Sequence, residues 1–275
     1  AFAFSPGQKA SSWLGDQYVG SDGQHYYAPA PYTYLVYNSD GTMDVRSSSG
    51  GNAYRHYMLT ASDGSSQQVY CVESGIAYNT SDNTYTSESG TNSNYLNLLP
   101  SEARRGITLT AIYGWKPGAS LPVSGINEDD YKMATQIILW EYQQQLRSDP
   151  YSRHGNGHAD ANQYFSVIAG RPAEKAYNWI LSQVASHSTI PSFTSTKKSE
   201  APELELKWDT EKKIYTLTVT DTNNLKIDLE TLKGSGVSVT RSGNKYTFTS
   251  KNMIMDPVTF EFRKNIPVAN DMLIW

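Results

Sequence analysis

The chain has a single cysteine, Cys71, among its 275 residues, and this feature constrains the fold more than any other. One thiol cannot form an internal disulfide, so each domain must be stabilised by a buried core without covalent cross-links of that kind. A free cysteine is more often a small buried hydrophobic side chain than a reactive group. An inert Cys71 is therefore the first hypothesis, and a chemical role requires a second residue that can react with the thiol.

The composition favours a β-rich exported protein of two domains. A length of 275 residues exceeds the usual size of one domain and allows a sizeable core. With 23 basic and 27 acidic residues and no dense Lys/Arg run, the chain is not expected to bind nucleic acid. No apolar run reaches the length of a membrane span, and we find neither a signal peptide nor a sorting tail. We therefore expect the mature fragment of a secreted protein that itself makes no membrane contact.

The tyrosines mark a boundary between the two expected domains. Eighteen of the twenty lie before residue 196, and the segment 188–196 has the Ser, Thr and Pro content of a linker. We predict a first domain over residues 1–196 and a second over residues 201–275. The expected fold class is α+β, in which a mixed β-sheet and helical domain is followed by a small all-β sandwich.

Local patterns predict the individual elements. Asn127 is expected to cap the clearest helix, because the acidic residues that follow it favour the positive end of a helix dipole. In the second domain, short runs of alternating apolar residues predict strands only. The expected elements are a short helix at 11–15, strands at 32–37, 53–59 and 67–73, a polar loop at 79–94, helices at 101–113, 129–147 and 172–186, and strands near 204–208, 215–219, 237–239, 246–248, 258–262 and 272–275.

Two short motifs carry a chemical signal. The first is Val-Tyr-Cys-Val-Glu at 69–73, and the second is Ala-Thr-Gln-Ile-Ile-Leu-Trp-Glu at 134–141. Helical spacing places Gln136 one turn before Trp140, on the side of the helix that faces the core. A buried amide without a partner costs roughly 1–3 kcal/mol, so Gln136 needs a bonded partner. An aromatic-Cys-aliphatic strand followed by a Thr-Gln-x-x-aliphatic-Trp helix resembles the thioester domains of Gram-positive surface adhesins.

This resemblance implies a thioester between the Cys71 sulfur and the acyl carbon of the Gln136 side chain. In that family an amine, typically a lysine of a host surface protein, opens the bond, so that Gln136 becomes the acyl donor of an isopeptide link. The implied function is single-turnover covalent attachment to a host extracellular protein or another primary amine, without enzymatic turnover, cofactor or metal. The resemblance also implies a cell-wall-anchored protein whose anchor lies outside this chain, and we expect a monomer.

Five further residues are candidates to support this chemistry. Tyr70 and Trp140 would shield the bond from water. Glu73, two residues after the cysteine, would either move protons or form a structural hydrogen bond. His154 and His158 lie in a Gly/Asn-rich loop and could act as a base or bind a metal, although a solvated loop near the reactive face is the stronger interpretation. That loop and the polar loop at 79–94 are our candidates for selecting the partner.

Two other functions remain open from the residues alone. The first is a cysteine hydrolase or acyl transferase that uses Cys71 with His154 or His158, and it would turn over a substrate while Gln136 stays a free amide. The second is a noncovalent ligand-binding β-module with an inert core cysteine, whose binding would not change in Cys71→Ala. In such a module the aromatic run 26–37 could stack on a ligand, although packed core aromatics explain the run better.

Overall fold

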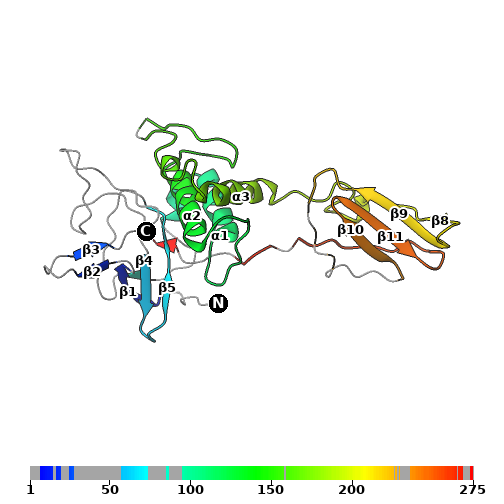
Figure 1. Ribbon diagram of the computed structural model, residues 1–275, viewed down its shortest axis with the longest axis horizontal. Helices are drawn as coiled ribbons and strands as arrows, with labels where there is room; N and C mark the ends of the chain where they lie inside the picture. Colours follow the sequence, from blue (N-terminus) through cyan, green and yellow to red (C-terminus); the bar gives the residue numbers. More distant parts are fainter. Residues whose placement is uncertain are drawn as a thin grey trace. The chain divides into compact units, whose positions relative to one another are not determined.

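The structure is a computed structural model, and it divides the chain into two compact units (Figure 1). Unit 1 comprises Ala1–His187 together with Val268–Trp275, and unit 2 comprises Ser188–Pro267. The residues that the structure describes are 7–14, 17–19, 25–27, 57–73, 85–86, 95–157, 159–225, 227, 229, 236–264, 266–268 and 273–274. None of the helices they form is long and apolar enough to span a bilayer.

Unit 1 contains three mutually packed α-helices within its described part, α1 (Ser101–Tyr113), α2 (Glu128–Gln143) and α3 (Ala173–Ser186) (Figure 1). All three predicted helices are confirmed. Helix α2 contacts both others and is buried from Asp130 to Tyr142 except at Lys132, so it forms the centre of the helical core. Short 3₁₀ turns lie at Leu96–Leu98 and Phe165–Val167 in this unit and at Lys198–Glu200 in unit 2.

Local side-chain chemistry determines where α2 begins and ends. The Asn127 side chain accepts the Asp130 backbone N–H at 2.8 Å, and the Asp130 carboxylate accepts the Asn127 N–H at 2.7 Å. This reciprocal capping box confirms the predicted N-cap. The helix ends at Gln143, short of the predicted residue 147, because Gln145 adopts a left-handed conformation with φ of 57°.

Helix α1 approaches α2 closely at Gly106, which we expect to tolerate no side chain. A Cβ atom at this position would overlap the ring of Tyr142, a fully enclosed residue that is 1% exposed. In Gly106→Ala this overlap should cost about 1–3 kcal/mol. The gain in helix propensity is only about 1 kcal/mol. Urea unfolding should therefore show a net loss of stability.

Thr108→Ala is the matched control for Gly106→Ala, because Thr108 is an exposed residue of the same helix. It should change the free energy of unfolding by no more than about 0.5 kcal/mol. A Gly106→Ala protein as stable as the wild type would show that α1 and α2 can separate without loss.

The described strands of unit 1 form antiparallel sheets with short elements. One sheet has the order β5-β4-β1-β7, and β2 pairs with β3 in a separate hairpin. The short helix expected at 11–15 is wrong, since residues 11–14 belong to β1, which is paired on both sides by β4 and β7. The expected strand at 32–37 lies outside the described residues. The bounds are β1 Lys9–Leu14, β2 Gln17–Val19, β3 His25–Tyr27, β4 Tyr57–Ala61, β5 Ser66–Gln68 and β7 Tyr85–Thr86.

The end of the chain returns to the cysteine-bearing strand. β12 (Leu273–Ile274) pairs in parallel with β6 (Tyr70–Cys71), and the Val72 N–H donates to the Ile274 carbonyl at 2.9 Å. The sequence predicts these terminal residues to be part of the second domain, whereas they lie in unit 1. A fragment ending at residue 196 would therefore lack the strand beside Cys71.

Unit 2 is built on a single antiparallel sheet within its described residues, with the order β10-β11-β9-β8. Tyr246 and Phe248 of β11 project into a cluster of aromatic rings that includes Phe193 and Phe262. The predicted α+β class is confirmed, with three helices and antiparallel sheets. Among the described residues of unit 2 a second strand layer is not seen, and residues 258–262 pack on this sheet without strand pairing. The bounds are β8 Lys207–Asp209, β9 Ile214–Thr220, β10 Ser238–Ser242 and β11 Lys245–Ser250.

Candidate functional site

Two hydrogen bonds join the side-chain amide of Gln136 to the backbone N–H and C=O of Cys71. The Cys71 N–H donates to Gln136 Oε1 at 2.9 Å, and Gln136 Nε2 donates to the Cys71 carbonyl at 2.6 Å. Gln136 is 0% exposed, so these bonds satisfy an amide that would otherwise be costly to bury. The acyl carbon of Gln136 is thereby held beside the residue that carries the thiol.

The backbone of Trp115 ties the two motifs to one another. Its carbonyl accepts the Tyr70 hydroxyl at 2.8 Å, and its N–H donates to the Thr135 hydroxyl at 2.9 Å. Tyr70 and Thr135 are the residues that immediately precede Cys71 and Gln136. The backbone of one residue therefore bonds to the residue before Cys71 in strand β6 and to the residue before Gln136 in helix α2, which gives the tyrosine and the threonine of the two motifs a structural role.

The Cys71 thiol lies in an environment that keeps it protonated. Burial raises its pKa, and the nearby Glu73 carboxylate raises the pKa further. The Glu73 backbone N–H and the Trp140 side chain act in the opposite direction, but the net shift is upward. A protonated thiol is a weak nucleophile, so reaction at this sulfur depends on donors that favour the thiolate.

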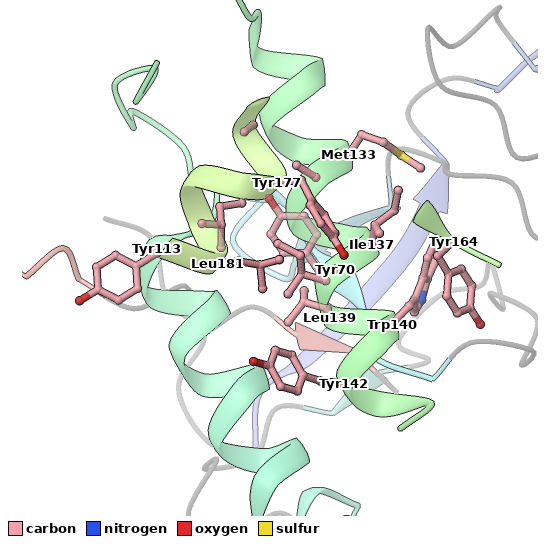
Figure 2. Close-up of a cluster of buried hydrophobic side chains, with 14 of the residues drawn as sticks. Tyr70, Tyr113, Met133, Ile137, Leu139, Trp140, Tyr142, Tyr164, Tyr177 and Leu181 are labelled. Carbon is pink, nitrogen blue, oxygen red and sulfur yellow. The ribbon is translucent and has the colours of Figure 1, made fainter. Parts of the chain in front are cut away.

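Trp140 covers the site from the same helix as Gln136. It is 3% exposed, and its ring lies against that of Tyr164 (Figure 2). The two ring centroids are 5.4 Å apart. Its indole nitrogen is buried, and no acceptor among the described residues lies at hydrogen-bonding geometry. An interaction with the Trp140 side chain nonetheless lowers the pKa of the Cys71 thiol.

Tyr95 is a residue of this site that sequence reasoning missed. Its hydroxyl donates to the Val72 carbonyl at 2.6 Å. Burial raises the pKa of Tyr95 to about 12, the Glu73 carboxylate contributes in the same direction, and the Gln143 side chain opposes both. Tyr95 follows a polar segment with no periodicity, so nothing local in the sequence indicates that it returns to the cysteine.

The remaining predicted site residues have different positions. Tyr70 belongs to the core, where its 1% exposed side chain bonds to Trp115 and lies among the helices (Figure 2). Glu73 lies close enough to act electrostatically on the thiol. His154 is exposed, and its ring is hydrogen-bonded to the Gly155 carbonyl. In the described structure it makes no hydrogen bond to Cys71.

Several expectations fall on residues that are not described. His158 lies outside the described part, as do the loop 79–94 except residues 85–86 and the aromatic run 26–37 except residues 26–27. In the described part of the chain, no group of three or more His, Cys, Asp or Glu side chains is placed to hold a metal ion.

Residues 68–186 match the family model described as the thioester domain, TED. This segment contains Cys71, Gln136 and all three α-helices. Residues 68–186 form a thioester domain. No curated protein matches the chain.

Among solved structures, the chain is similar to a pilus-presented adhesin, Spy0125 (Cpa), with 12% sequence identity over 89% of this chain and 71% of that chain. The TM-score of 0.30 is too low for residue-by-residue transfer. The site of the thioester domain therefore rests on the geometry of this chain.

The thioester domain also buries a charged cluster next to Trp140 in the sequence. Glu141 is 0% exposed, and both its carboxylate oxygens accept the Tyr177 hydroxyl, at 2.7 and 3.0 Å. Arg147 is 2% exposed and lies 3.4 Å from the carboxylate through Nε, while its Nη2 donates to the Tyr177 hydroxyl at 2.7 Å. Arg153 adds a second cation at 3.9 Å from Glu141 and lies over the Phe165 ring. This cluster joins α2, α3 and the segment between them.

Proposed function

We propose that the chain is a covalent surface adhesin whose internal Cys71–Gln136 thioester is opened by an amine. The observation that carries this proposal is the pair of hydrogen bonds by which the backbone N–H and C=O of Cys71 hold both polar atoms of the Gln136 amide. The thioester-domain match over residues 68–186 supports the same reading. A structural glutamine would need partners, but it would not need them beside the only thiol of the chain.

Thioester formation follows from the positions of these atoms. The Cys71 sulfur attacks Gln136 Cδ and forms an S–C bond, while negative charge develops on Oε1, where the Cys71 N–H already donates. The Cδ–Nε2 bond then breaks, and the amide nitrogen leaves as ammonia with the proton of the thiol. Primary amides are poor electrophiles in water, and fixed attack geometry can lower the barrier by about 7–11 kcal/mol.

Opening of the bond would attach the protein to its target. An amine nitrogen attacks Gln136 Cδ, an amide bond forms, and the sulfur leaves with the electron pair and takes up the proton of the amine. The product is an isopeptide link to a lysine of a host extracellular protein, formed once per molecule and without turnover. Such a protein would be secreted and held at the bacterial cell wall by an anchor outside this sequence.

Intact-mass measurement tests the bond directly. We expect the freshly purified wild-type chain to be lighter than its sequence mass by one ammonia, because Gln136 loses its nitrogen when the thioester forms. Cys71→Ala and Gln136→Ala should each show the full calculated mass. The wild-type thiol should also resist alkylation under native conditions.

The alternatives give different results in the same measurement. A wild-type chain at its full sequence mass, with a thiol that alkylates without denaturant, would exclude the thioester. Turnover of a substrate by a protein whose Gln136 remains an amide would instead favour the cysteine hydrolase or acyl transferase, which the exposed position of His154 does not support.

A further inference from the structure

We infer that the indole N–H of Trp140 is the donor that stabilises negative charge on the Cys71 sulfur during thioester formation and opening. This inference rests on the proposed function and assigns a specific atom to it. Shielding from water would require only the aromatic bulk of Trp140. A hydrogen-bond donor at the sulfur would in addition accelerate the reaction.

The placement of Trp140 follows from the helix. Trp140 is four residues after Gln136 on α2, so both side chains lie on the same side, one turn apart. Gln136 is fixed on the backbone of Cys71, and Trp140, one turn further along the helix, belongs to the buried cluster against which Cys71 packs. Trp140 is 3% exposed and packs on Tyr164, so the ring has little freedom to turn away.

The indole N–H of Trp140 is a hydrogen-bond donor without a bonded acceptor among the described residues. Its N–H is buried, and no described atom accepts it at hydrogen-bonding geometry. A buried unsatisfied donor is unfavourable, and it becomes favourable when an anion forms next to it. The sulfur becomes such an anion when it attacks Gln136 as a thiolate and again when it leaves under attack by an amine. The unsatisfied donor of Trp140, seen beside the free thiol, is therefore relieved when the sulfur carries negative charge.

Burial and the neighbouring acidic groups disfavour a charged sulfur. Glu73 is the carboxylate that opposes the thiolate, and Tyr95 lies close enough for its own ionisation to respond to Cys71. Burial also disfavours the charged sulfur. Against these, the donors that act on the sulfur are the Glu73 backbone N–H and the indole of Trp140. Trp140 is thus the side-chain donor that a substitution can remove.

The step in which Trp140 acts is the departure of sulfur. An amine nitrogen forms a bond to Gln136 Cδ, the Cδ–Sγ bond breaks, and its electron pair remains on Sγ. The indole N–H donates to this sulfur as charge develops, and the proton released by the amine then neutralises the thiolate. Hydrogen bonds to charged groups are worth about ten- to a hundredfold in an equilibrium or rate.

Trp140→Phe tests the inference, because phenylalanine keeps an apolar ring against Tyr164 and removes the N–H. With methylamine as the probe, the variant should lose its thioester about ten- to a hundredfold more slowly than the wild type. Trp179→Phe is the matched control, since Trp179 is a partly buried indole of α3 that packs on Tyr131 away from the cysteine. It should react at the wild-type rate. A Trp140→Phe protein that reacts as fast as the wild type, or faster, overturns the inference.

A second measurement does not depend on the thioester. In Gln136→Ala the thiol is free, and its alkylation rate as a function of pH reports the pKa of Cys71. Adding Trp140→Phe should move this profile to higher pH, because the thiolate loses a donor. An unchanged profile overturns the inference. A wild type without the mass loss of one ammonia would instead refute the proposed thioester, and the profile would still report on the indole.

If Trp140→Phe does not fold, an isosteric amino acid at residue 140 provides the same test. Benzothienylalanine placed at residue 140 keeps the shape of tryptophan and replaces the N–H by sulfur. Slower methylamine opening in this protein, together with wild-type thermal unfolding, supports the inference. Wild-type opening kinetics in the same protein overturns it.

Discussion

Treatment of the purified chain with a primary amine should leave a covalent adduct on Gln136 that survives boiling in detergent. The adduct should be complete in the wild type and absent in both Cys71→Ala and Gln136→Ala, since neither variant can store an activated acyl group. Cys71 should become reactive toward alkylating reagents in step with the adduct. Peptide mapping by mass spectrometry after proteolysis would locate the modification and measure both events.

The rate of this reaction should depend on proximity and on the free base of the amine. A small amine must collide with the bond, whereas a lysine on a bound partner is held beside it, so the partner should react much faster. For a lysine-like amine with a pKa near 10.4, the rate should rise about tenfold per pH unit below that value. Gln183→Ala, a partly buried glutamine of α3, is the control variant and should react as the wild type does. Adducts found on Cys71 as thioethers or disulfides would contradict the mechanism.

Glu141→Ala should produce the largest loss of stability among single substitutions in the thioester domain. The change would leave the Arg147 guanidinium, 2% exposed, without its counterion and would remove both acceptors of the Tyr177 hydroxyl. Breaking a buried ion pair by removing one partner typically costs about 3–5 kcal/mol. Denaturant unfolding monitored by tryptophan fluorescence would measure the difference.

Two variants define the origin of that loss. Glu128→Ala removes an exposed carboxylate from the first turn of the same helix and should cost at most about 1 kcal/mol. Tyr177→Phe removes the bridging hydroxyl but keeps the charges, and it should cost about 1–3 kcal/mol. A Glu141→Ala protein no less stable than Glu128→Ala would show that water reaches Arg147 in the folded state.

The buried cluster around Glu141 predicts that the free energy of unfolding depends on pH. Burial raises the pKa of Glu141 from 4.5 to about 6, although Arg147, Tyr177 and Arg153 all oppose the shift. A raised folded pKa means that the folded domain binds the proton more tightly than the unfolded chain. The resulting stability is fully present below a pH of about 4.5 and is lost as pH rises through about 6. Relative to Glu141→Gln, the wild type should gain stability when the pH falls from about 7 to about 5.

Short-range patterns were sufficient to predict the three helices of unit 1. The Asn127 cap and the helical spacing of α2 depend on residues a few positions apart, so they are legible in the sequence. The pairing of Cys71 with Gln136 was instead implied by the resemblance of their two motifs to a known family, and the structure brings these two residues together. The end of α2 was misplaced because the left-handed turn at Gln145 has no glycine to mark it.

Long-range contacts required the tertiary structure. No local pattern indicates that Leu273–Ile274 would pair with the strand that carries Cys71. Nor does one indicate that the backbone of Trp115 would bond to both motifs, or that the Tyr95 hydroxyl would donate to the Val72 carbonyl. Strand pairing and buried polar contacts are satisfied by whichever distant group the packed chain brings within reach. The sequence alone therefore determined which residues could react, and the tertiary structure decided which donors surround them, because a donor acts through its distance and not through its place in the chain.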